Sequence, residues 1–345
     1  MGLTRRRGRA RLERRLVGGE QLAPEWRAWV LENLLRAGSS EDIIRLLVER
    51  GVDLRRATAA VGQLRRSPEL AACSKLLASS GRAEQVVELL LRHRRAVDQV
   101  PRCPAPAAEA FYEDVFAAQR PMLFTNLVTS WSAFGKWSPQ YLRDRFGHVE
   151  VEVTDGREAD PAYDQNGKKH ATRCLLSAFV DRVTQAGESN DFYMVAQGRN
   201  TGLPELAELF GDLALPAGWF DDALLPTSSA LWFGPRGTIT PLHHDTSSIL
   251  FCQVYGSKRV QLISPLELSM YGVAQSLYSR ANAETREAIP EGVQVLELTL
   301  AAGEALFIPA GYWHQVRALD VSISLALNGF RRPNSFDWFR PGELR

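Results

Sequence analysis

Residues 237–245 read GTITPLHHD, and this stretch says more about the chain than any other. Only six histidines occur in 345 residues, and two of them are adjacent here. On a β-strand, residues at i and i+2 project to the same face, so His243 and Asp245 share a face and His244 points the other way. The segment therefore predicts a strand that offers one imidazole and one carboxylate to the same point.

A third metal ligand has to come from another part of the chain, and His314 in GEALFIPAGYWHQV (303–316) is the best candidate. The histidines at 93, 148 and 170 lie in polar stretches typical of helices and loops. Two histidines and one carboxylate are typical of non-heme Fe(II) oxygenases, whereas zinc prefers a closed tetrahedral set. The alternative is that His243 and His314 are buried structural histidines of a barrel.

Short apolar runs rich in β-forming residues follow residue 110, separated by turn residues. Many short strands at this spacing predict a β-sandwich or barrel, with helices over 138–146 and 204–211. The runs are PMLFTNL, HVEVEVT, DFYMVAQ, ALWFG, SILFCQVY, KRVQLI, VQVLELTL, ALFIPA and VSISLAL.

Two spaced motifs make the chain similar to the Jumonji-C (JmjC) hydroxylases. Gly237-x5-His243-x-Asp245 resembles the first cupin motif, and Gly303-x5-Pro309-x-Gly311-x2-His314 resembles the second. The resemblance covers roughly residues 108–332. It implies a mainly β fold, a double-stranded β-helix of the cupin or jelly-roll type, in addition to the N-terminal helices. It also implies Fe(II) held by His243, Asp245 and His314, with 2-oxoglutarate and O2 as cosubstrates.

Lys258 supports the same interpretation from the residues alone. VYGSKRV resembles a hairpin with a two-residue Gly256-Ser257 turn, after which Lys258, Val260 and Leu262 share an inward face. An inward lysine needs an anion, because an unpaired buried charge is costly. The distal carboxylate of 2-oxoglutarate would supply it; the alternative is a solvated lysine at a hairpin tip.

The resemblance assigns further contacts with 2-oxoglutarate. Thr240 matches a family hydroxyl and Tyr193 a family tyrosine, both of which bind the same carboxylate as the lysine; alternatively, Thr240 is a turn residue and Tyr193 a core aromatic. Ile249 departs from the family, which often has asparagine there, so Ser247 or Asn328 would have to compensate. Asn328 matches an asparagine of the asparaginyl hydroxylase branch, or it caps a strand end.

The N-terminal hundred residues differ from the rest in charge and texture. They carry 20 Lys and Arg against 12 Asp and Glu, a net charge of +8, whereas the remainder carries 21 against 28, a net charge of −7. Helical patterns with caps and glycine stops predict helices in 24–38, 39–51, 67–81 and 82–95. We expect a basic segment at 1–20, a recognition or dimerisation domain at 21–99, a Pro/Ala linker at 100–109 and the JmjC-like catalytic domain at 110–345.

Composition narrows the cellular setting. No apolar run approaches the 18 residues of a membrane span, and the basic N-terminus lacks the apolar core of a secretory signal. The four cysteines are far apart in sequence, so neither a disulfide framework nor a zinc knuckle is predicted. We expect a cytoplasmic enzyme without membrane partners.

Several functions are compatible with these residues. The first is hydroxylation of a protein or peptide side chain, with an acidic peptide such as a leader sequence recognised by the basic helical domain. The second is RNA hydroxylation or methyl-lysine demethylation; the N-terminal arginines permit phosphate contacts, although no RNA-binding signature accompanies them. The third is a non-catalytic cupin that binds a ligand or partner. A homodimer is compatible with each.

Overall fold

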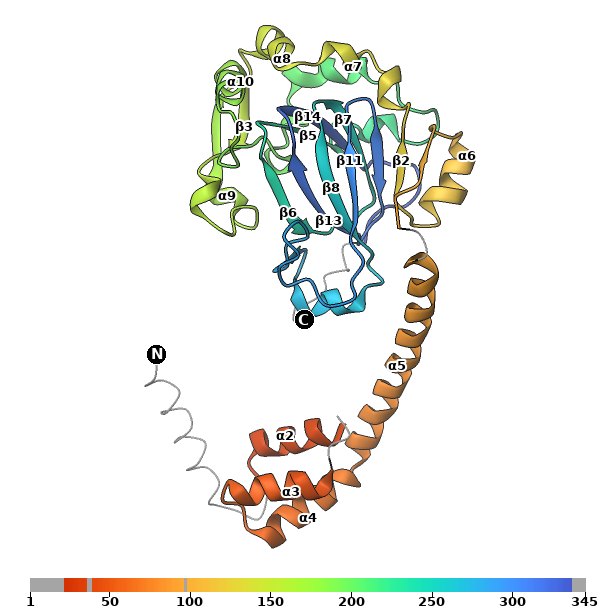
Figure 1. Ribbon diagram of the computed structural model, residues 1–345, viewed down its shortest axis with the longest axis vertical. Coiled ribbons are helices and arrows are strands. Elements are labelled where there is room, and N and C mark those ends of the chain that lie inside the picture. Colours follow the sequence, from red (N-terminus) through yellow and green to blue (C-terminus); the bar gives the residue numbers. More distant parts are fainter. Residues whose placement is uncertain (1–21, 36–38, 96–97, 337–345) are drawn as a thin grey trace. The chain divides into compact units, whose positions relative to one another are not determined.

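The computed structural model describes residues 22–35, 39–95 and 98–336 (Figure 1). Contacts divide the chain into two compact units, Met1–Leu90 and Leu91–Arg345. The basic segment expected at residues 1–20 lies outside the described part. None of the described helices combines the length and the apolar character needed to cross a membrane.

The first unit is helical, as expected, and has a core of its own. Ser39 caps its second helix by accepting a hydrogen bond from the Asp42 backbone N–H at 3.1 Å. The two helices predicted on either side of Gly81 form one continuous helix, so glycine does not act as a stop there. The helices are α2 (Pro24–Leu35), α3 (Ser40–Glu49), α4 (Leu54–Arg65) and α5 (Pro68–Arg95), the last of which crosses the boundary between the units. The core residues are Val30, Ile43, Leu47, Val52, Ala57, Val61 and Leu64.

Two six-stranded sheets form the second unit. The first has the order β1-β2-β12-β7-β14-β5 and the second β11-β8-β13-β6-β10-β9. The strands of the first are β1 (Arg102–Cys103), β2 (Met122–Phe124), β12 (Ala305–Ile308), β7 (Ile249–Tyr255), β14 (Ser322–Leu327) and β5 (Ser229–Gly234). Those of the second are β11 (Leu296–Leu300), β8 (Lys258–Ile263), β13 (Trp313–Ala318), β6 (Ile239–His243), β10 (Tyr278–Ser279) and β9 (Ala274–Gln275). This cupin-like arrangement confirms the predicted jelly-roll fold.

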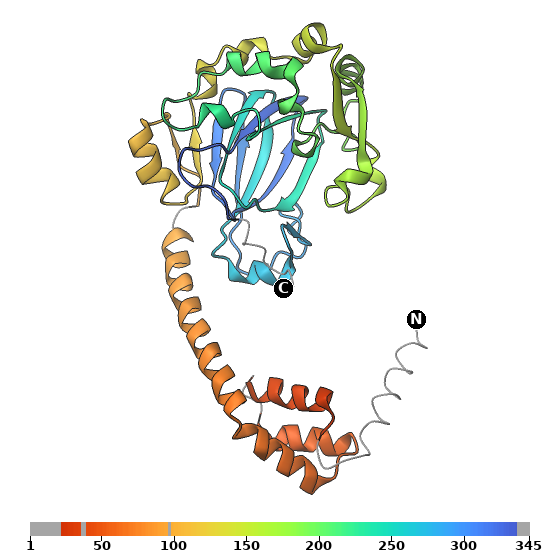
Figure 2. The ribbon, with the colours of Figure 1, turned by 180° about the vertical axis from the view of Figure 1, so that it is seen from behind.

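Helical segments of residues 108–224, yellow to green in Figure 2, run around the strands. A two-stranded sheet, β3 (Glu150–Thr154) with β4 (Ala171–Leu175), accompanies them. The α-helices are α6 (Ala108–Ala110), α7 (Ala133–Lys136), α8 (Pro139–Phe146), α9 (Gly167–His170) and α10 (Leu176–Gln185). A π-helix, η2 (Phe111–Phe116), precedes 3-10 turns at η3 (Val128–Ser130), η4 (Arg157–Ala159), η5 (Ala196–Gly198), η6 (Asn200–Gly202), η7 (Pro204–Asp212), η8 (Asp222–Leu224) and η9 (Leu268–Val273).

Side-chain alternation on β7 shows how the sheets pack. Leu250, Cys252 and Val254 join the large cluster that includes the helical segments, whereas Phe251 joins a cluster containing Val260 of β8. Period-two alternation places these two sets on opposite faces of the strand. The cluster that contains Phe251 and Val260, called the inner cluster below, therefore lies between the two sheets, next to the cavity described in the next subsection.

The predicted hairpin at Gly256-Ser257 is wrong, because β7 and β8 belong to different sheets. The two residues instead carry the chain from one sheet to the other. Gly256 has φ +70°, and a Cβ atom there would lie 2.2 Å from the Val321 carbonyl oxygen. Only glycine suits so close an approach in the left-handed region. Lys258 begins β8 facing inward, as the alternation predicted.

Other segments also differ from their predicted structure. Within 100–109, expected to be a linker, Arg102–Cys103 forms β1 and pairs with β2 in parallel. Of DFYMVAQ (191–197), only Tyr193 and Met194 form isolated bridges, to Thr154 and Phe233. The helix expected at 204–211 is the 3-10 segment η7. These short pairings depend on distant partners, which local patterns do not reveal.

Candidate active site

A cavity of about 360 Å³ opens between the two sheets. Its lining includes Thr240 and His243 of β6, Phe251 of β7, Trp232 of β5 and His314 of β13. Strands from both sheets therefore contribute side chains to one space, as expected for a ligand site in the mouth of a β-barrel.

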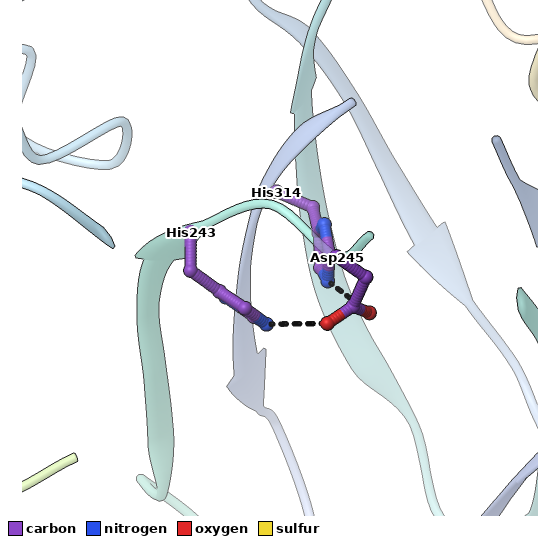
Figure 3. Close-up of side chains that lie close together, drawn as sticks. All are labelled: His243, Asp245 and His314. Carbon is purple, nitrogen blue, oxygen red and sulfur yellow. Dashed lines mark ion pairs between the residues drawn. The ribbon is translucent and has the colours of Figure 1, made fainter. Parts of the chain in front are cut away.

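The three predicted metal ligands, His243, Asp245 and His314, meet in this cavity and are called the metal-ligand cluster below. His243 and His314 are direct cross-strand partners on β6 and β13, and their ring centroids lie 4.1 Å apart. Asp245 follows β6 and directs its carboxylate at both rings (Figure 3), with Oδ1 3.9 Å from His243 Nε2 and Oδ2 3.7 Å from His314 Nε2. Ligand atoms of the three residues lie within 4.8 Å of one another. Such a set can hold one metal ion.

Hydrogen bonds orient both imidazoles for coordination. His243 Nδ1 lies 2.9 Å from the Pro241 carbonyl oxygen, and His314 Nδ1 lies 3.0 Å from that of Tyr312. A carbonyl only accepts, so each Nδ1 carries the proton and each Nε2 lone pair faces Asp245. Burial, together with repulsion from His243, lowers the pKa of His314 to about 4. The buried ring is therefore neutral near pH 7, as a metal ligand has to be.

His244 lies outside the three-residue cluster. Its ring is buried and meets Trp313 edge-on, with centroids 4.7 Å apart and planes at 84°. It borders the cavity, but its Nδ1 lies 3.4 Å from the Asp245 backbone oxygen rather than beside the carboxylate. Burial lowers the pKa of this histidine as well.

Lys258 is 1% exposed, and its ammonium donates a hydrogen bond of 2.8 Å to the Tyr193 hydroxyl. The Nζ atom lies 5.1 Å from the centre of the Phe251 ring, 5.4 Å from that of Tyr193 and 6.0 Å from that of Trp232. All three rings line the cavity. Burial lowers the pKa of Lys258 to about 7, because loss of hydration disfavours the charged ammonium. A buried cation therefore lies next to three of the rings that line the cavity, and it suits an anionic ligand.

The remaining predicted contacts occupy different depths. Thr240 is buried and lines the cavity, paired with Val316 across the sheet. Asn328 is exposed, also borders the cavity, and donates a hydrogen bond of 3.3 Å to Ser247 Oγ. Ile249 borders the cavity at the start of β7. Ser247 and Asn328 together thus supply polar groups near the apolar Ile249.

Asp164 and Tyr278 are among the cavity residues that the sequence did not reveal. The Tyr278 ring lies 5.9 Å from that of His243, nearly parallel at 28°, and its hydroxyl donates to Asp164 Oδ2 at 3.1 Å. Burial raises the pKa of Tyr278. Asp164 comes from a connection and Tyr278 from the two-residue strand β10, and neither segment carries a periodic signal; the pairing of β10 with β6 brings Tyr278 beside His243.

Arg157 contacts Asp164 and the backbone of β6. It is 1% exposed, donates to the Ile239 carbonyl oxygen at 2.7 Å, and stacks on Tyr163 with the guanidinium carbon 4.3 Å from the ring centre. Its Nη2 lies 3.9 Å from Asp164 Oδ1, so it compensates part of that carboxylate's charge.

Comparisons with known proteins agree with this geometry. A family model described as a cupin-like domain matches residues 107–335. Relatives include "Lysine-specific demethylase 8" of Danio rerio, 29% identical over 66% of this chain and 57% of its own, and "Jumonji C domain-containing protein 5" of Drosophila melanogaster, 28% identical over 66% and 59%. "Bifunctional peptidase and (3S)-lysyl hydroxylase JMJD7" of Homo sapiens is 28% identical over 64% of this chain and 80% of its own. For the two animal proteins named first and two further relatives, the match spans only 52–59% of the relative's own length.

Proposed function

The chain belongs to the cupin-like domain family, and on that premise we propose that it is an Fe(II)- and 2-oxoglutarate-dependent oxygenase that hydroxylates a side chain of a protein or peptide. One observation carries the proposal: the two-histidine, one-carboxylate cluster lines the same cavity as the rings of Tyr193, Trp232 and Phe251, which surround the buried Lys258 ammonium. The cluster matches the ligand set of non-heme Fe(II) oxygenases. A ribosomally made peptide precursor is a candidate substrate.

His243, Asp245 and His314 would hold the iron through two imidazole nitrogens and one carboxylate oxygen. The carbonyl groups that fix both Nδ1 protons favour this role, because they leave both Nε2 atoms free for the metal. Bound Fe(II) and 2-oxoglutarate together supply the activation of O2 that converts a substrate C–H into C–OH while releasing succinate and CO2.

The protein's own groups position the cosubstrate and exclude water. Lys258, with Tyr193 and Thr240 beside it, would bind the carboxylate remote from the metal. The aromatic rings around the ammonium keep water from that end of the cavity, which strengthens a charge-assisted contact. Asn328 and Ser247 lie toward the exposed side, where a substrate would enter.

Iron-dependent formation of succinate tests the proposal. The purified chain, given Fe(II), 2-oxoglutarate and O2, should form succinate at a low rate, and an added substrate peptide should raise that rate. Mass spectrometry of a proteome, or of peptides encoded nearby, should show a gain of one oxygen atom in the substrate only when iron and 2-oxoglutarate are both present. Failure to form succinate under any of these conditions would favour a non-catalytic cupin that binds a ligand or partner.

Demethylation of methyl-lysine is a second candidate, favoured by relatives that are called lysine-specific demethylases. Hydroxylation of an N-methyl group releases formaldehyde, whereas side-chain hydroxylation retains the oxygen in the peptide. Formaldehyde assays on methylated peptides therefore separate the two. An RNA substrate is also compatible, and binding that falls steeply with salt concentration would identify it.

We further propose that the helical unit recognises the substrate or mediates homodimerisation, and that the enzyme acts in the cytoplasm. The unit's own apolar core supports a separate role, since it folds around residues that contribute nothing to the candidate active site. Every predicted metal or cosubstrate residue belongs to the second unit.

A further inference from the structure

Arg199 adopts an unusual backbone conformation beside the cavity. Its φ is +47° and its ψ is 31°, in the left-handed region, and it is one of five non-glycine residues with positive φ among those described. For residues with a Cβ atom, asparagine and aspartate excepted, this conformation is energetically unfavourable. Such strain persists where the surrounding structure over-determines it, and it is often found at functional sites.

The neighbouring residues show how the strain is held. The Arg199 N–H donates to the Ala196 carbonyl oxygen at 3.0 Å, and its own carbonyl accepts from the Gly202 N–H at 3.0 Å. The buried Asn200 amide bonds both backbone groups of Glu152, accepting at 2.9 Å and donating at 2.8 Å. Thr201 Oγ1 donates to the Ser229 carbonyl oxygen at 2.7 Å. The turn is thus attached to both β3 and β5, and Arg199 stands at a fixed place between them.

The side chain of Arg199 carries a free positive charge. It is exposed and makes no hydrogen bond or ion pair with any residue that the structure describes. Arg199 is also the one lysine or arginine among the described residues lining the cavity. Of the two carboxylates there, Asp245 belongs to the metal-ligand cluster, and Asp164 is held by Tyr278 and lies near Arg157. Nothing in the described lining therefore neutralises Arg199.

We propose, building on the proposed function, that Arg199 determines substrate specificity by binding a carboxylate of the peptide substrate at the rim of the cavity. The acidic group lies close in sequence to the residue that is hydroxylated, because one cavity receives both. A single cation beside hydroxyl groups such as Ser228 and Ser247 suits one carboxylate. A nucleic-acid backbone would instead require several Lys or Arg contacts.

Peptide selection without turnover tests this proposal. The full-length chain, loaded with Fe(II) and 2-oxoglutarate under anaerobic conditions, is used to capture peptides from a random library whose ends are acetylated and amidated. The captured pool should be enriched in Asp or Glu. Arg199→Asn removes the charge but suits the left-handed backbone, and it should reduce this enrichment about five-fold, as expected for an ion pair at a solvated rim. Arg199→Glu should enrich Lys or Arg instead.

Controls separate the possible outcomes. Arg120→Ala removes an exposed arginine outside the cavity lining and should leave the selection unchanged. A second library with free C-termini distinguishes a terminal carboxylate from a side-chain carboxylate. A wild-type pool without acidic enrichment, enrichment that survives in Arg199→Asn, or capture of mixed-sequence RNA in place of peptides overturns the proposal. Admitting O2 and measuring succinate then tests the proposed function separately, since acidic enrichment without succinate refutes catalysis and leaves the recognition intact.

Discussion

The ammonium of Lys258 lies 2.8 Å from the hydroxyl of Tyr193, which joins two residues 65 positions apart in sequence. Lys258 begins a strand of the second sheet, and Tyr193 lies in an irregular segment bridged to Thr154. The contact therefore connects the barrel to the chain that runs around it. A neutral hydroxyl satisfies one N–H of the ammonium but does not balance its charge, so the site is prepared for an anion.

Replacing Lys258 by Met should weaken binding of 2-oxoglutarate. Methionine keeps the length among the surrounding rings but removes a charge-assisted contact worth about 1.5–3 kcal/mol, so the 2-oxoglutarate requirement should rise roughly ten- to a hundredfold. Titrating 2-oxoglutarate against succinate formation measures the change. Tyr193→Phe, which removes only a neutral partner, should have a smaller effect. An unchanged titration in Lys258→Met would refute the assignment.

The lowered pKa of Lys258 predicts that stability depends on pH. In the protein without ligand this pKa is about 7, whereas in the unfolded chain it is about 10.4, so the unfolded state binds more protons between these values. The free energy of unfolding should therefore rise from pH 7 to pH 10 relative to Lys258→Met. Thermal unfolding of both proteins across this range measures the difference. Saturating 2-oxoglutarate should flatten it, because the anion restores the charged form.

Removing a member of the metal-ligand cluster should abolish metal binding without unfolding the barrel. His243→Ala, Asp245→Ala and His314→Ala should each lose bound iron by colorimetric assay after gel filtration, and with it all succinate formation. His244→Ala is the matched control and should retain iron, because its ring packs on Trp313 outside the cluster. The opposite pattern, in which His244→Ala loses iron and His243→Ala keeps it, would show that the strand faces are assigned incorrectly.

Alanine at Gly256 should destabilise the second unit strongly. The new Cβ would lie 2.2 Å from a backbone oxygen, in addition to the left-handed strain of about 1–2 kcal/mol. Gly292→Ala is the control, since Gly292 has φ +79° but a Cβ atom added there would meet no atom within 4 Å. Denaturant unfolding should therefore show a clearly larger loss for Gly256→Ala. Equal losses would mean that the backbone around Val321 yields easily.

Deleting residues 1–90 should leave the chemistry of the second unit intact. The cut keeps Arg95, which pairs with the buried Glu267 at 2.5 Å, and Val100, which packs in the inner cluster. Iron binding and substrate-independent succinate formation should persist, while turnover of the true substrate falls through weaker binding. Light scattering shows whether a dimer is lost as well. A folded truncated protein with full activity on the true substrate would exclude a recognition role for the first unit.

The sequence predicted those features that depend on local alternation. His243 and Asp245 reach the same point because they lie two residues apart, and Lys258 faces inward with Val260 for the same reason. The sequence does not reveal that Gly256-Ser257 connects two sheets, because a two-residue turn has the same residue pattern whether it closes a hairpin or carries the chain to another sheet. Asp164 and Arg199 could not be predicted, since their places depend on how irregular connections pack on the barrel, and Tyr278 could not because β10 is only a two-residue strand. The continuous α5 shows in turn that one glycine does not end a helix when both flanks favour it.

The segments that supply the cavity lining have a consequence for how cupin-like proteins evolve. The predicted metal ligands come from paired strands of the barrel or its immediate edge, whereas Asp164 and Arg199 come from connections between the strands. Insertions and deletions are tolerated in connections far more readily than in paired strands. Descendants of one ancestral gene can therefore diverge in the groups that line the cavity while inheriting the same two-histidine, one-carboxylate cluster, and duplication followed by change in these connections is a short route from one specificity to another.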